Sequence, residues 1–240
     1  MISDQELLAL NKRGLIPGPD EDEAAFLERI SPFLSSQPIP IPQLDIAPDW
    51  ITLTYSNKNL SFFQGAATWI ENKHPTIQLR SEFAKGSYLI YHPEEIIAHE
   101  AAHACRMAFE EPRFEEIFAY STSPNRFRRF FGPLFRTTTE STLFLISCLL
   151  SLTAPIFDSF LPLLLPLLLL TLFTFRLLHS HHTLNRCLKN IQALTHNPSL
   201  TYGAAYRMTD HEIALFARHP SSIATQPPSL RWRLICLAYF

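Results

Sequence analysis

The stretch HPEEIIAHEAAHACRMAF, residues 92–109, decides how this chain is organised. Pro93 suits the first position of a helix, where its missing N–H is not needed, and two acids follow it in the first turn. The pattern predicts a helix that runs to about Phe109. His99 and His103 are then one turn apart on one helix face, held rigidly in mid-helix.

The next residue after His99 is Glu100, which completes the pattern H-E-x-x-H. Two imidazoles at this spacing, with a carboxylate beside them, are typical of a catalytic zinc site. Such a zinc ion usually takes three protein ligands and leaves a fourth position for water. The sequence therefore predicts a metal site that needs one more ligand.

A second helix is predicted at residues 113–120, after a tight turn, and it can fold back on the first. It carries two glutamates, Glu115 and Glu116. We choose Glu116 as the third ligand, and Glu115 is the alternative.

The four residues that begin at Glu116 read Glu-Ile-Phe-Ala, similar to the Glu-Gly-Phe-Ala segment of gluzincin peptidases of the aminopeptidase type. Together with the H-E-x-x-H motif, residues 92–120 resemble an HExxH zinc metallopeptidase of the branch with a Glu as third ligand. Twelve residues separate His103 from Glu116, which is fewer than in the aminopeptidases.

The resemblance implies that His99, His103 and Glu116 bind Zn²⁺, which lowers the pKa of a bound water toward about 7 and polarises the scissile carbonyl. It implies that Glu100 takes the proton of this water and passes it to the leaving amine. A group that stabilises the oxyanion is also needed, and we assign this role to Tyr120. The other candidates for it are Tyr206, Arg207 and His211.

The expected fold class is α+β, mostly α. Residues 50–55 alternate and are β-branched, which predicts a strand, and residues 76–80 repeat the pattern more weakly. We expect a small zincin-like domain with a short antiparallel sheet, in which 76–80 is the edge strand that aligns a peptide substrate. A transmembrane helical hairpin completes the expected fold.

The hairpin is predicted from residues 142–178, a Leu- and Phe-rich run with only two charges, Asp158 and Arg176. One helix of this length would measure about 55 Å, nearly twice a hydrocarbon core of about 30 Å. Folded at residues 154–159, the run gives two spans of about 17 residues each. A buried helical pair in a soluble protein is the alternative.

Basic residues flank this run on both sides, which predicts that both flanks and both termini are cytoplasmic and that only the turn at Asp158 reaches the far side. We expect a bacterial inner membrane, with the lipid bilayer and a peptide or protein substrate as partners. The net charge of −2 gives no general attraction to nucleic acid. The flanking residues are Arg126, Arg128, Arg129 and Arg136 before the run, and Arg176, Arg186 and Lys189 at its end and beyond it.

Four segments are expected along the chain: an N-terminal helical segment with a proline-rich connector (1–48), the zincin-like catalytic domain (49–137), the transmembrane hairpin (138–179) and a C-terminal cytoplasmic helical segment (180–240).

Helix signals lie within the two terminal segments. Asp20 is the predicted N-cap of a helix over 20–31. Residues 184–195 are predicted as a helix of their own, and Thr209 with Glu212 predicts a capping box at the start of another.

The favoured function is a membrane-anchored zinc metallopeptidase that cleaves peptide bonds at the cytoplasmic face, with Glu100 as general base. One alternative is a non-catalytic membrane scaffold or interaction protein with a structural or degenerate metal helix. Another is a metal-dependent hydrolase whose substrate is not a peptide.

Overall fold

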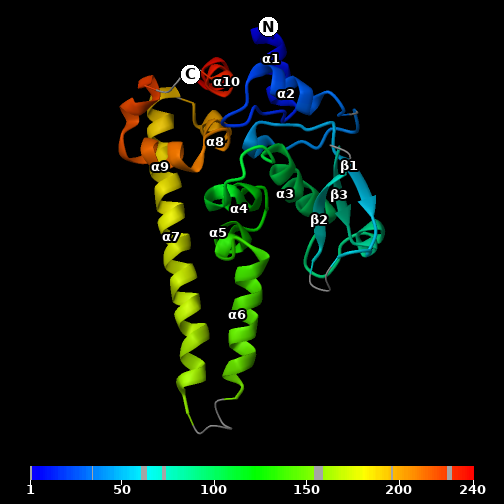
Figure 1. The fold of residues 1–240 in the computed structure, drawn as a ribbon, viewed down its shortest axis with the longest axis vertical. Helices are drawn as coiled ribbons and strands as arrows, with labels where there is room; N and C mark the ends of the chain where they lie inside the picture. The colour runs from blue at the N-terminus through cyan, green and yellow to red at the C-terminus, as the bar shows by residue number, and fades with distance from the viewer. Residues whose placement is uncertain are drawn as a thin grey trace.

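A computed structural model of the chain describes residues 2–33, 35–60, 64–71, 74–153, 159–195, 197–225 and 229–240. Figure 1 shows a head of short helices and one small sheet, from which two helices, α6 and α7, extend side by side. The α-helices are α1 (Asp4–Lys12), α2 (Glu23–Ile30), α3 (Pro93–Cys105), α4 (Pro112–Ser121), α5 (Arg126–Phe131), α6 (Thr138–Ser151), α7 (Leu161–Thr195), α8 (Pro198–Tyr206), α9 (Asp210–Arg218) and α10 (Leu230–Tyr239). The strands are β1 (Thr52–Tyr55), β2 (Ala66–Glu71) and β3 (His74–Leu79), and the short 3₁₀ helices are η1 (Pro42–Leu44), η2 (Ser81–Lys85), η3 (Gly132–Leu134) and η4 (Pro220–Thr225).

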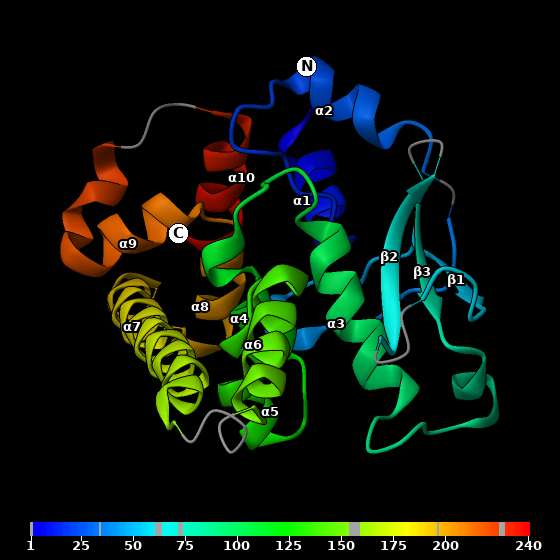
Figure 2. The ribbon, with the colours of Figure 1, turned by 60° about the horizontal axis from the view of Figure 1, so that its bottom comes forward.

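The expected class, α+β and mostly α, is confirmed, but the sheet is mixed rather than antiparallel. Its strand order is β1-β3-β2: β3 pairs in parallel with β1 and antiparallel with β2. The strand predicted at 76–80 is β3, which lies in the centre of the sheet, so its expected position at the edge is wrong. The strand at the edge beside α3 is β2, which the sequence patterns did not predict (Figure 2).

Helix α3 begins at Pro93 as predicted and ends at Cys105, before the expected Phe109. Its buried side consists of small residues, which let neighbouring elements approach its backbone closely: Ala101, Ala102, Ala104 and Cys105. From α8, the hydroxyl of Tyr206 donates a hydrogen bond of 2.5 Å to the carbonyl of Ala102. This contact fixes α3 against the C-terminal part of the head.

Side chains cap several helices of the head. The capping box of Thr209 and Glu212 at the start of α9 is confirmed. At α2 the N-cap is Asp22 instead of the predicted Asp20, because the helix begins three residues later than expected. Nearby, Glu21 is held by Arg29, whose guanidinium donates two hydrogen bonds of 2.7 and 2.8 Å to it.

Helix α7 continues without a break through the position where a separate helix was predicted to start at Leu184. The polar group His-Ser-His-His at 179–182 interrupts the apolar run but not the helix, since neither glycine nor proline occurs between Leu167 and Thr195. The second half of α7 buries Leu184, Cys187 and Ile191 in the head. One helix therefore joins the head to the apolar region.

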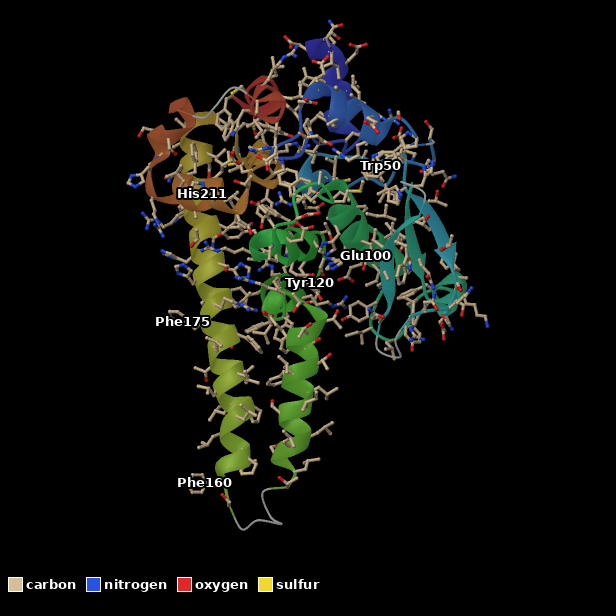
Figure 3. All side chains as sticks on the ribbon, viewed as in Figure 1. Trp50, Glu100, Tyr120, Phe160, Phe175 and His211 are labelled. Atoms are coloured by element: carbon tan, nitrogen blue, oxygen red, sulfur yellow. The ribbon has the colours of Figure 1, made fainter. Side chains whose placement is uncertain are left out.

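Among the described residues one helix, Pro162–Thr195, is long and apolar enough to cross a membrane. Helix α6 has 14 residues and measures about 21 Å, which is less than a hydrocarbon core. Of the turn predicted at 154–159, residues 154–158 lie outside the described residues. Phe160 and Phe175 of the apolar region point outward, and their side chains are 69% and 70% exposed (Figure 3).

The two ends of the chain meet in the head (Figure 1). Arg207, which follows α8 and is fully buried, donates hydrogen bonds to Asn11 Oδ1 (2.6 Å) and to the carbonyls of Leu44 (2.8 Å) and Gly203 (2.7 Å). At the rim of the head, Arg233 of α10 forms an ion pair with Asp4. Residues near the two termini thus share one core.

We predict that Arg207→Met lowers the free energy of unfolding by about 3 kcal/mol, because it leaves several buried acceptors without a donor. Urea unfolding of the purified protein, followed by tryptophan fluorescence, measures this change. Arg218→Met removes an exposed arginine of α9 and is the control, which we expect to stay within about 0.5 kcal/mol of the wild type. Equal midpoints for the two variants would contradict the structural role of Arg207.

Candidate metal centre

The two histidines of the H-E-x-x-H motif point their Nε2 atoms at a common point. These atoms are 3.3 Å apart, and the imidazole rings meet edge to face with centroids 4.9 Å apart. Both side chains are about one-fifth exposed, at 18% for His99 and 23% for His103. The site is therefore half-buried, and solvent can reach it.

Glu116 of α4 completes this group. Its carboxylate lies 3.8 Å from His99 Nε2 and 3.6 Å from His103 Nε2, each measured to its nearer oxygen. One ligand atom from each of the three residues lies within 4.8 Å of the others. Glu110, in the turn between α3 and α4, adopts a left-handed conformation with φ 52°, and this reversal brings α4 back against α3.

These distances suit a small divalent ion. A tetrahedral ion with bonds of about 2.0–2.1 Å separates its ligand atoms by about 3.4 Å. The two Nε2 atoms, 3.3 Å apart, match this value, and the Glu116 carboxylate approaches to 3.8 Å of His99 through Oε2 and to 3.6 Å of His103 through Oε1. Two imidazoles and one carboxylate form a donor set that zinc accepts, and other divalent transition metals accept it as well.

Glu115, the alternative ligand, has a different place. One of its oxygens accepts a hydrogen bond of 3.0 Å from His103 Nδ1, and the other accepts one of 2.9 Å from Arg106 Nε. With its Nδ1 proton donated to Glu115, His103 would bind a metal through Nε2 once that atom has given up its own proton. Glu115 thus orients the His103 ring through Nδ1, while Glu116 faces the two Nε2 atoms.

The carboxylates set the charge of the site. Burial opposes protonation of His103, but the hydrogen bond to Glu115 and the charges of Glu116, Glu115 and Glu100 outweigh it and raise the His103 pKa to about 9. Burial and the charge of His103 lower the His99 pKa to about 3. Burial raises the pKa of Glu116. Three carboxylates around two imidazoles make a site that attracts a cation.

Glu100 lies beside this group and faces the sheet. Its carboxylate accepts a hydrogen bond of 2.8 Å from the hydroxyl of Thr68, on the edge strand β2. His99 and Glu100 line a cavity of about 200 Å³, together with residues of β2 and α4. Glu100 is therefore held at the cavity wall.

Tyr120 lines the same cavity, one turn after Glu116 on α4. Its ring meets that of His99 edge to face, with centroids 4.5 Å apart (Figure 3). Gly132 leaves room for this ring, because a Cβ at that position would lie 2.3 Å from Tyr120 Cδ1. Burial raises the pKa of the Tyr120 hydroxyl, so it stays protonated and can donate a hydrogen bond.

The other oxyanion candidates lie elsewhere. Tyr206 donates its hydroxyl to the carbonyl of Ala102, and Arg207 is bonded to Asn11 and to backbone carbonyls. His211 is exposed on α9, away from Glu100 (Figure 3). The structure brings none of these three to the cavity.

Sequence reasoning missed two residues that support the site, Thr68 and Arg106. The run Thr68–Trp69–Ile70 is β-branched and aromatic, a signal that predicts a strand and could have revealed β2. Arg106 follows the last residue of α3 and is 1% exposed. A buried arginine requires hydrogen-bond partners, but the sequence alone does not say which.

Comparisons of this chain with models of protein families, with curated proteins and with solved structures find no match.

Proposed function

We propose that this chain is a membrane-anchored, zinc-dependent metallopeptidase. The observation that carries the proposal is the convergence of His99, His103 and Glu116, while Glu100 stays outside this group at the wall of the adjacent cavity. A metal-dependent hydrolase needs metal ligands and a separate general base, because a carboxylate that coordinated the metal could not also accept a proton.

A divalent ion held by these three residues would polarise a substrate carbonyl and make water more acidic. Glu100 accepts the proton of the attacking water and delivers it to the nitrogen of the leaving amine, so that the carbonyl carbon gains a hydroxyl and the amide C–N bond breaks. Thr68 holds the Glu100 carboxylate in place by its hydrogen bond. Tyr120 donates a hydrogen bond to the oxygen of the tetrahedral intermediate.

The sheet supports a peptide as the substrate. Among the described strands β2 pairs with β3 alone, so its other edge offers backbone groups for an extended chain to pair with. The same strand contributes Ala66 to the cavity wall and Thr68 to the Glu100 contact. An extended peptide bound along this edge would pass the metal site.

The anchor in this proposal is the pair α6 and α7, which enter the membrane together as two spans with both termini on the cytoplasmic side, α6 being the shorter span. The termini share one core in the head, so they lie on the same side of any membrane that these helices enter. At the head end of the pair, Arg176 donates hydrogen bonds of 2.5 and 2.6 Å to Glu140 and joins the two helices. The basic flanks favour the cytoplasmic side for the head.

We predict that the purified protein binds about one zinc ion per chain and that His99→Ala and Glu116→Gln each weaken binding at least tenfold. Elemental analysis after dialysis against a weak chelator gives the metal content. Glu94→Gln, an exposed carboxylate change on the same helix, is the control and keeps the metal. Full metal content in Glu116→Gln would exclude this residue as a ligand.

Glu115→Gln separates orientation from coordination. The amide still accepts one hydrogen bond but loses the charge that pairs with Arg106, so we expect zinc affinity to fall about 10–100-fold without being abolished. A competition titration with a chromophoric chelator gives the dissociation constant, and circular dichroism confirms that the variant is folded. A loss as complete as that of His99→Ala would assign Glu115 as a ligand instead.

Glu100→Gln tests the chemistry. We expect this variant to bind zinc as the wild type does and to lose about 10²–10⁴-fold in peptide hydrolysis, because the general base is removed. Hydrolysis of casein, followed by release of labelled peptides, is the measurement, with Glu94→Gln as the active control. If Glu100→Gln kept wild-type activity, the role of Glu100 as base would be wrong.

A further inference from the structure

A second pocket opens on a neighbouring face of α4, about 100° around the helix from the candidate metal centre. Its volume is about 540 Å³, within the range of about 300–1,000 Å³ that small-molecule sites occupy. Helix α4 contributes Ile117 and Ser121 to this pocket, whereas it presents Glu116 and Tyr120 to the metal centre. The remaining lining residues are Gln43, Arg126, Arg129, Phe130, His181, Pro198 and Tyr202.

This pocket is basic. Arg126 and Arg129 line it from α5, and none of the described residues that line it is acidic. Within the described part of the chain, neither arginine takes part in an ion pair, whereas their neighbour Arg128 pairs with Glu95. Both are exposed, so the pocket offers two guanidinium groups to an anion from solution.

The pocket lies where the exposed apolar surface of α7 ends. Leu178 is still 49% exposed, and His181, one turn further, lines the pocket and stacks on Phe130 with centroids 4.8 Å apart. On α5, Phe127 and Phe131 are 68% and 42% exposed beside the arginines. Aromatic side chains mixed with basic ones at the end of an apolar helix are typical of the membrane–water interface.

We propose that this pocket binds the phosphate-bearing headgroup of an anionic phospholipid. Arg126 and Arg129 pair with the phosphate, Tyr202 offers its hydroxyl group to the headgroup, and the exposed phenylalanines of α5 contact the start of the acyl chains. The inference rests on the proposed membrane location of α6 and α7, but it requires neither the metal nor hydrolysis.

The test is binding of a short-chain lipid to the full chain in a non-ionic detergent, measured by isothermal titration calorimetry. Dihexanoyl phosphatidylglycerol is the anionic probe, and dihexanoyl phosphatidylcholine is the zwitterionic one. We expect phosphatidylglycerol to bind at least tenfold more tightly than phosphatidylcholine. Arg126→Gln/Arg129→Gln is expected to lose at least tenfold in phosphatidylglycerol affinity, and Arg126→Lys/Arg129→Lys, which keeps the charge, less than fivefold.

A matched control removes the same charge elsewhere. Arg186 and Lys189 are exposed on α7 and do not line the pocket, so Arg186→Gln/Lys189→Gln keeps wild-type affinity within twofold. Equal loss in this control would show a general charge effect and overturn the proposal. Absence of phosphatidylglycerol binding, or equal affinity for phosphatidylcholine, would overturn it too.

Binding of inorganic phosphate, measured in the same way, distinguishes a lipid headgroup from free phosphate as the ligand of this pocket. We expect it to bind at least tenfold more weakly than phosphatidylglycerol, because it lacks the glycerol and acyl groups that reach the aromatic side chains. Equal affinity would make this a site for free phosphate instead of a lipid. The probes are water-soluble and no substrate is cleaved, so these results are independent of the zinc content and of the activity of Glu100→Gln.

Discussion

The position of the candidate metal centre depends on the ion pair between Arg106, which is buried, and Glu115, whose side chain is one-fifth exposed. The guanidinium of Arg106 is almost completely buried, donates to Glu115 at 2.9 Å and also bonds the carbonyls of Tyr206 and Met208. One side chain thus ties the end of α3 to α4 and to the segment between α8 and α9. Burying a charge costs several kcal/mol unless its partners are in place, so these three elements must keep their relative positions for the ion pair to form.

The same ion pair determines how α4 is turned. Consecutive residues on a helix point about 100° apart, so two adjacent glutamates cannot face the same way. With Glu115 directed at Arg106 and His103, Glu116 is directed at the two Nε2 atoms. The core therefore sets which of the two glutamates faces the histidines, and it places there Glu116, the residue chosen from the sequence, with Glu115 held by Arg106 instead.

The parts of the fold that local signals specify were predictable from the sequence. Pro93 predicted the start of α3, Thr209 with Glu212 predicted the capping box of α9, and the spacing of His99 and His103 predicted their shared face. The order of the sheet was not predictable. Strand β1 pairs directly with β3, although β2 lies between them in the sequence, and no local pattern encodes such a pairing. The sequence predicted a separate helix at 184–195 because the chain changes from apolar to polar at residues 179–182. No residue there stops a helix, so α7 continues through them.

Helix α4 connects the core, the metal centre and the basic pocket. Glu115 reaches the buried arginine, Glu116 faces the histidines, and Ile117 with Ser121 lines the pocket beside α5. The start of α5 is in turn joined to the metal helix, because Ser123 and Arg128 both bond Glu95 of α3. A ligand that ordered α5 would therefore act, through these contacts, on the helix that bears both histidines.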